Sequence, residues 1–113
     1  MIISTTETLP HGRILKVLGV VRGNTIRARH IGRDLQAVLR HVVGGEVVEY
    51  TKLMGEAREQ ALDRMVAEAE QLGANAVIAV RITTSMVMTG AAEILCYGTA
   101  VVWEAIPTSD TQR

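Results

Sequence analysis

The stretch from Tyr50 to Ile82 constrains the fold more than any other part of this chain. Its apolar residues recur at intervals of three and four, which places them on one face of an α-helix. This stripe consists of Met54, Ala57, Ala61, Met65, Ala69 and Leu72. Gly73 follows where helices commonly end in the left-handed conformation, and an apolar strand begins at Ala76. We therefore expect a long helix that lies close to a sheet, because its alanines leave room for close backbone approach.

Length and composition predict a single small domain. The chain has 113 residues, of which 48% are hydrophobic and 21% are charged, and this balance excludes a disordered protein. Only 3% are aromatic, so the core must be aliphatic. Twelve basic residues balance twelve acidic ones, which argues against binding to nucleic acid or to an anionic membrane. We expect one domain over residues 1–106 and a flexible polar tail over 107–113.

Cysteine usage and the N-terminal sequence favour a soluble cytoplasmic protein. Cys96 is the only cysteine, so no intramolecular disulfide can form. The first ten residues lack the basic and long apolar segments of a signal peptide, and no apolar run is long enough to span a bilayer.

The remaining segments predict an α+β fold, in which a small antiparallel sheet carries two helices on one face. Strands are expected over 1–6, 14–21, 25–29, 76–88 and 94–103, with a turn or bulge at 22–24 and a hairpin turn at 89–92.

A first helix is expected to begin near residues 32–34 and to end at Gly44-Gly45, followed by a loop over 46–49. The last strand is apolar on both faces, and two helices can cover only one face of a small sheet. A second subunit would therefore supply the other cover.

The order of several short motifs resembles that of the YbjQ-like family. The motifs are STT near the N-terminus, LGVVRG at 18–23, RD at 33–34, VGG at 43–45, and then EAREQAL, LGANAV and YGTAVVWE. The resemblance covers Ile2 to about Ala105 and implies a dodecin-like fold assembled into a symmetric ring, most often a homopentamer. The family is labelled heavy-metal-binding without an established activity, so it implies a fold and an assembly more than a function.

Two departures from the family pattern bear on function. Where family sequences usually carry acidic residues after LGANAV, this chain has Arg81, Thr83 and Thr84, which removes the obvious carboxylate ligands for a metal. Residues 27–30, where the family tends to be neutral, read RARH and make the local charge strongly positive.

The candidate ligands for a soft or heavy metal are Cys96, Met86 and Met88, because thiolates and thioethers suit copper(I). A hairpin could bring Met86 opposite Cys96, but the sequence does not give its register. Cysteine and methionine are also ordinary core residues, and that alternative is favoured. No second cysteine and no paired histidine motif supports the metal.

The candidate anion site consists of Arg27, Arg29, His30 and Arg33, beside the start of the expected first helix. Free backbone N–H groups and Gly32 would allow close approach of a phosphate or carboxylate there. The alternative is that these side chains lie on an edge strand, in solvent or paired with carboxylates across a subunit interface.

Glu68 is the carboxylate that lies on the apolar stripe of the long helix, one turn from Met65 and from Leu72. A carboxylate held against a core or a subunit interface would have a raised pKa and would be able to act as an acid or base. The favoured alternative places Glu68 at the edge of the stripe, paired with Arg64 or with an arginine of a neighbouring subunit.

No catalytic template is present, and His11, His30 and His41 are expected to be solvated because no two share a ligand-like spacing. The sequence therefore predicts a non-enzymatic homo-oligomer, most simply a pentameric ring, that binds a heavy-metal ion or small anion at subunit interfaces. The alternative is a structural or protein-interaction ring with no small-molecule ligand.

Overall fold

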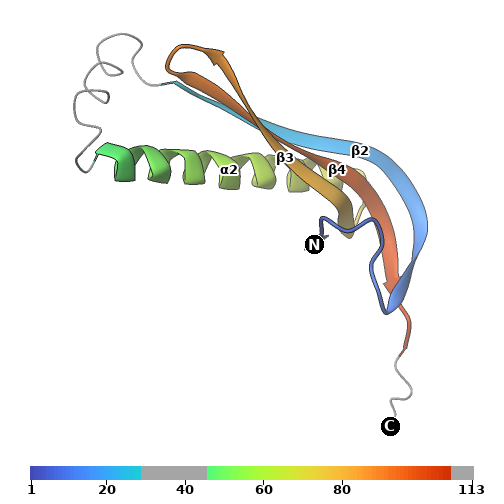
Figure 1. Ribbon diagram of the computed structural model, residues 1–113. Coiled ribbons are helices and arrows are strands. Elements are labelled where there is room, and N and C mark those ends of the chain that lie inside the picture. The colour runs from blue at the N-terminus through green and yellow to red at the C-terminus, as the bar shows by residue number, and fades with distance from the viewer. Residues whose placement is uncertain (29–45, 108–113) are drawn as a thin grey trace.

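The fold is a four-stranded mixed sheet with one long helix on one face, and the computed structural model describes residues 1–28 and 46–107 (Figure 1). The strand order is β1-β3-β4-β2. The strands are β1 (Ile2–Ile3), β2 (Gly12–Ala28), β3 (Ala76–Met88) and β4 (Ala91–Ala105). β2 and β3 pair antiparallel with β4, whereas β1 pairs parallel with β3. The expectation of a purely antiparallel sheet was therefore wrong at its β1 edge.

The helix predicted from the apolar stripe is α2, which spans Glu46–Gln71. It begins at Glu46, so the loop expected over 46–49 was wrong. Gly73 takes the predicted left-handed conformation, with φ of +87°, and the chain turns there into β3. The other expected helix, near residues 32–43, lies outside the described residues.

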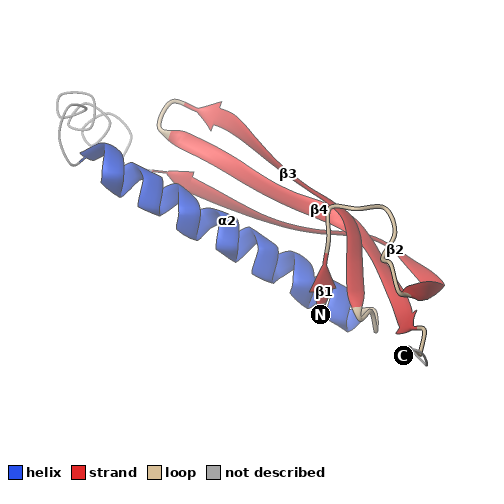
Figure 2. Ribbon diagram, turned by 60° about the horizontal axis from the view of Figure 1, so that its bottom comes forward, coloured by secondary structure: helices blue, strands red, loops and turns tan. Residues whose placement is uncertain are grey.

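α2 packs chiefly against β2 and β4 and barely touches β3 (Figure 2). Four members of the predicted stripe, Ala57, Ala61, Met65 and Ala69, have no exposed surface. They meet a sheet face that includes Val21, Val77, Ile94, Cys96 and Ala100. Leu72 is 47% exposed, because it lies beyond the last residue of the helix. The core is aliphatic, as the composition requires.

Gly23 brings the backbone of α2 close to the sheet. A Cβ atom at Gly23 would collide with the carbonyl oxygen of Ala61 and the amide nitrogen of Met65. Residues 22–24 therefore form no turn, and β2 continues straight through them to Ala28. The irregularities in β2 occur earlier, between Ile14 and Lys16 and between Val17 and Gly19. The expectation of a turn or bulge at 22–24 was therefore wrong, and the role of Gly23 is close packing.

An irregularity in β3 turns two valines toward the helix. The register of β3 with β4 shifts between Ile78 and Arg81, and Ala79 has a positive φ of +55°. Strict alternation would place Val77 and Val80 on opposite faces of the sheet. The extra residue lets both join the core under α2.

The opposite face of the sheet is covered in part by the N-terminal segment of the same chain. Leu9 packs there against the buried residues Ala76, Ile78 and Val101, as do Ile14 and Trp103. Backbone hydrogen bonds from Ser4 N–H to the carbonyl of Val77, and from the N–H groups of Ala79 and Val80 to the carbonyls of Thr6 and Ser4, hold the segment along β3. Over this area, the second apolar face of the sheet is therefore covered by the N-terminal segment of the same chain.

Candidate functional site

The densest set of specific polar contacts joins β2 to α2. Glu68 Oε1 accepts a hydrogen bond from the backbone N–H of Arg22 at 2.7 Å. Arg64 Nη1 donates to the backbone carbonyl of Asn24 at 2.6 Å. One turn of helix separates the two side chains, so they reach successive outward-facing groups of the same strand. We call these four residues the β2–α2 seam.

Two further contacts continue along the same line toward the start of the helix. Thr25 Oγ1 donates to the carbonyl of Ala57 at 3.1 Å, in a buried position. Arg27 Nη2 donates to Gln60 Oε1 at 2.8 Å, and its Nε is buried without a hydrogen-bond partner. The Thr25 bond compensates a buried hydroxyl for its lost hydration, whereas Arg27 Nε has no such compensation.

Glu68 lies at the edge of the apolar stripe, and its side chain is exposed. The expected ion pair with Arg64 is absent: Arg13–Glu104, at 3.9 Å, is the only ion pair among residues 1–28 and 46–107. Each member of the expected pair instead binds the backbone of β2. This arrangement occupies unpaired N–H and C=O groups of an edge strand, which are otherwise able to recruit another strand.

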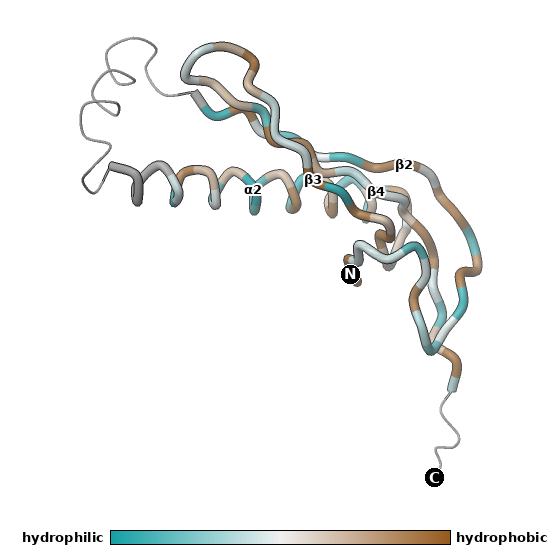
Figure 3. Tube along the Cα trace, in the orientation of Figure 1, coloured by the Kyte–Doolittle hydropathy of each residue, from teal (hydrophilic) through white to brown (hydrophobic). Residues whose placement is uncertain are grey.

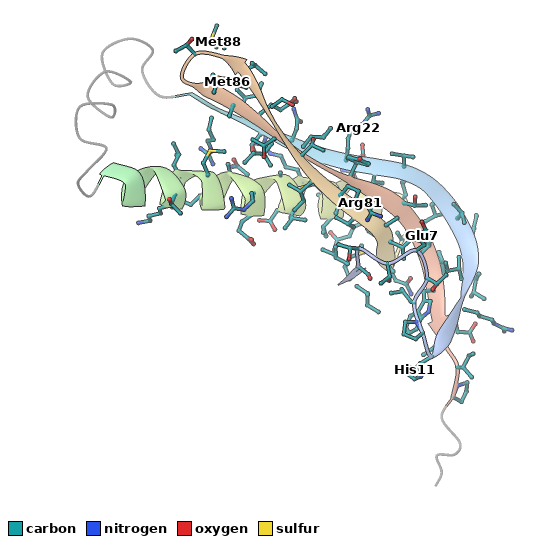
Figure 4. The ribbon with its side chains drawn as sticks, in the orientation of Figure 1. Glu7, His11, Arg22, Arg81, Met86 and Met88 are labelled. Carbon is teal, nitrogen blue, oxygen red and sulfur yellow. The ribbon has the colours of Figure 1, made fainter. Side chains whose placement is uncertain are left out.

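The three candidate metal ligands do not converge within one chain. The hairpin register places Cys96 opposite Ile82, and Met86 opposite Ala92, so the expected pairing of Met86 with Cys96 does not occur. Cys96 has no exposed surface, whereas Met86 is 78% and Met88 54% exposed. Figure 4 shows both methionines near the tip of the β3–β4 hairpin, away from the core beneath α2.

Burial raises the pKa of the Cys96 thiol, and the nearby negative charge of Glu59 raises it further. A metal binds the thiolate, so a raised pKa weakens this side chain as a ligand at neutral pH. Within the described residues, no three His, Cys, Asp or Glu side chains are grouped so that they could hold a metal ion.

Of the candidate anion site, Arg27 is the only member among the described residues. It lies opposite Ala92 on β4 and is bonded to Gln60, so its guanidinium is already engaged with α2. Arg29, His30, Arg33 and the expected helix start lie outside the described residues. His11 is exposed, as expected, and it takes a positive φ of +66° in the turn before β2.

Leu9 was not predicted as a core residue, and Arg64 was predicted only as a partner of Glu68. Leu9 stands alone among polar neighbours, and no periodicity marks it as a core residue. Arg64 is one of several charges on the helix, and its acceptor lies 40 residues earlier in the chain. The signal for the seam was Gly23, since a glycine inside a strand often marks a close approach of another backbone.

A family model described as "Putative heavy-metal-binding", that of the YbjQ family, matches residues 1–104. The chain belongs to this family. Curated YbjQ relatives carry the name "UPF0145 protein". The relative from Methanosarcina acetivorans is 59% identical over 101 residues, covering 89% of this chain and 95% of the relative. Relatives from Archaeoglobus fulgidus and Thermotoga maritima are 56% and 53% identical, over 89% and 94% of this chain and 94% and 100% of theirs.

A solved structure supports the fold assignment for this YbjQ family member. It is the crystal structure of a protein of unknown function from Pediococcus pentosaceus, which belongs to the DUF74 family. The TM-score is 0.65 at 15% sequence identity, and the match covers 92% of this chain and 98% of that one. At this identity the likeness shows the fold alone.

The helix that is described does not have the character of a membrane span. Over residues 1–28 and 46–107, no helical segment combines the length and the hydropathy needed to cross a bilayer.

Proposed function

We propose that this protein is a non-enzymatic homo-oligomer, a ring of five subunits, whose ligand site for a heavy-metal ion or small anion is built between subunits. The observation that carries the proposal is the large number of apolar side chains left exposed on β2 and β3. Figure 3 shows hydrophobic residues along both strands. On β2 they are Leu15, Val17, Val20 and Ile26, and on β3 they are Ile82, Met86, Val87 and Met88.

The degree of exposure supports self-association. Val20 is 70% and Val17 is 64% exposed on the face opposite α2, beyond the area that Leu9 covers. Contiguous exposed apolar patches on a small protein commonly mark an interface, whereas single exposed apolar residues do not. The N-terminal segment covers only part of the second face, so the rest of that face is available to another subunit.

The placement of the candidate ligands supports a site between subunits. Within one chain, Cys96 is buried under α2 and lies apart from the exposed Met86 and Met88. Thioether groups from neighbouring chains can converge where the hairpin tips meet, and methionine suits soft metal ions such as copper(I). The family description supports a metal ion as the first ligand to test.

A structural or interaction ring without a small ligand is the second candidate function. The raised pKa of Cys96 and the lack of any three-residue ligand group among the described residues favour it over the metal. In that case, the exposed apolar strands would serve assembly alone, and the outer surface of the ring would meet another protein.

Native mass spectrometry of the untagged protein tests the proposal, because it reports the number of subunits and any retained ligand together. We expect a five-subunit ring or a multiple of it, and a fixed ratio of copper(I) per ring after titration. The variant Met86→Leu with Met88→Leu should lower that ratio, and Cys96→Ser should leave it unchanged. A monomer rejects the assembly; a ring without bound metal or anion leaves the interaction ring as the function.

A further inference from the structure

The two long edges of the sheet differ in how they are protected: β2 forms one, and β3 forms the other beyond the short strand β1. At the centre of the β2 edge, the outward N–H of Arg22 and the outward C=O of Asn24 are bonded to side chains of α2. β2 also carries two register irregularities and Lys16. Bulges, lysines and covering helices are the devices by which natural sheets prevent their edges from adding another strand. The β2 edge is therefore protected from pairing with a further strand, and we call such an edge guarded.

The β3 edge is guarded only over its first residues. β1 and the N-terminal segment bond to it as far as the N–H of Val80, and Arg81 Nη1 donates to the carbonyl of Thr5. Beyond this point, residues 82–88 read ITTSMVM, without charge, proline or glycine. All seven are exposed, and no backbone partner other than β4 is present within the described part of the chain.

The register shows which groups of this edge are free. Arg22 points its N–H away from β4 and lies opposite Tyr97, so Tyr97 directs its own backbone groups toward β3 and Arg81. Because backbone direction alternates along a strand, Ile82, Thr84 and Met86 point their N–H and C=O groups away from the sheet. The open edge thus offers three successive donor and acceptor pairs.

We infer that the open edge of β3 pairs with the same edge of a second copy of this chain, antiparallel, about a twofold axis at Thr84. Among the strands of the described residues, the other long edge is β2, which is guarded, so β3 is its own best partner. Thr84 then faces Thr84 of the second copy, and Ile82 faces its Met86. These threonine and apolar pairs are favourable cross-strand neighbours.

Charge also favours this arrangement. Arg81 is the single charged residue beside the open edge. In the antiparallel pairing it lies opposite Val87 of the second copy, whereas parallel pairing in register would set it against another Arg81. An isologous contact of this kind closes on itself and exposes no further edge.

The inference rests on the self-association in the proposed function and adds a twofold contact to it. A five-membered ring has no twofold axis relating its own subunits, so the β3 contact would join two rings face to face into ten chains. If the protein forms only a dimer, the twofold contact is supported and the proposed ring is rejected. Assembly size therefore separates the two ideas.

The test is native mass spectrometry of Thr84→Lys, Thr84→Glu and their equimolar mixture. Thr84 is exposed, so each single variant should fold. In each variant, like charges would meet across the twofold axis and repel each other, so the contact should dissociate and the assembly should have half the wild-type mass. Mixing the two variants should restore the full mass, because lysine then faces glutamate. Glu70→Lys, at an exposed site on α2 that belongs to neither proposed interface, should keep the wild-type mass.

Three results would overturn the twofold contact: unchanged masses in both Thr84 variants, no recovery on mixing, or a lower thermal stability of Thr84→Lys at unchanged mass. The last would mean that the edge is covered within its own chain. A wild-type monomer would reject the proposed function as well. A wild-type ring of five that no Thr84 variant alters would reject the contact alone.

Discussion

Glu68 and Arg22 lie 46 residues apart in the chain and meet at 2.7 Å, where the helix carboxylate accepts the backbone N–H of the strand. The contact ties the last part of α2 to the edge of β2, and Arg64 repeats it at the carbonyl of Asn24. Helix and strand edge are thereby held in one register, which fixes how far the sheet extends beyond the helix.

Replacing Glu68 should therefore lower stability. We expect Glu68→Ala to reduce the free energy of unfolding by about 1 kcal/mol, since it leaves an edge N–H without its protein acceptor. Glu68→Gln should lose less, because its amide oxygen can still accept. Urea denaturation followed by circular dichroism measures both. Glu70→Ala, two residues away and exposed, is the control and should change stability by less than about 0.5 kcal/mol. Equal losses for the 68 and 70 variants would contradict a specific role of the seam.

Gly23 and Gly55 should respond in opposite directions to the same substitution. Gly23→Ala places a methyl group against the backbone of Ala61 and Met65, so we expect a loss of about 1–3 kcal/mol from overpacking. Gly55→Ala lies inside α2, where the nearest atom, Arg58 Nη2, is 3.7 Å from the added carbon. Removing a glycine from a helix interior should stabilise the protein by about 0.5–1 kcal/mol. The melting temperatures of the two variants, compared with that of the wild type, test both expectations. An unchanged melting temperature for Gly23→Ala would contradict the close approach of α2 to Gly23.

The thiol of Cys96 should make stability fall as the pH rises. Its pKa is raised in the folded protein by burial and then by Glu59, so the unfolded chain loses the proton first. Below the unfolded pKa of about 8.5, both states keep the proton and this contribution is constant. Above that pH the unfolded state binds fewer protons, so the free energy of unfolding decreases until the folded pKa is passed.

The measurement is the free energy of unfolding between pH 7 and pH 10, with Cys96→Ala as the reference. The wild type should lose more stability over this interval than the variant, and the native thiol should react slowly with a thiol reagent. A native thiol that reacts fully at neutral pH would show that the side chain is neither buried nor protonated.

Leu9 should behave as a core residue despite its position in a polar segment. Leu9→Ala would remove apolar contacts with the cluster of Ala76, Ile78 and Val101, against which Trp103 also packs, and should cost about 1–2 kcal/mol, less than at a fully buried site because Leu9 is half-buried. Trp103 is the only tryptophan, so its fluorescence should shift to longer wavelength in the variant. Thr8→Ala, at an exposed neighbour, is the control. Unchanged stability together with an unchanged emission spectrum would show that Leu9 does not contribute to this cluster.

Local patterns predicted the elements that depend on neighbours in sequence. The spacing of Ala57, Ala61 and Met65 identified the buried face of α2, and Gly73 marked its end. The β3–β4 hairpin was expected with a turn at 89–92, and its tip is the shorter Thr89-Gly90. These features follow from helical periodicity and from the dihedral freedom of glycine, which act over a few residues.

The candidate sites were less predictable, because each depends on register. Met86 and Cys96 were plausible cross-strand neighbours until the shifts in β3 placed Ile82 opposite Cys96. A bulge moves every later side chain along the partner strand, and a sequence of apolar residues does not mark where it falls. Glu68 was recognised as a charged residue on the apolar stripe. Its role as the acceptor for the Arg22 N–H could not be predicted, because it depends on how the helix packs on the strand.

The sequence by itself determined a long amphipathic helix, a following strand and hairpin, an aliphatic core and membership of a family. Only the tertiary structure decided that Gly23 receives the helix backbone, that Leu9 closes part of the second face, and that β2 is guarded while β3 is open. The reason is physical: periodicity records which side of an element is apolar, whereas edge protection and close approach depend on groups that are distant in sequence and meet only when the chain folds.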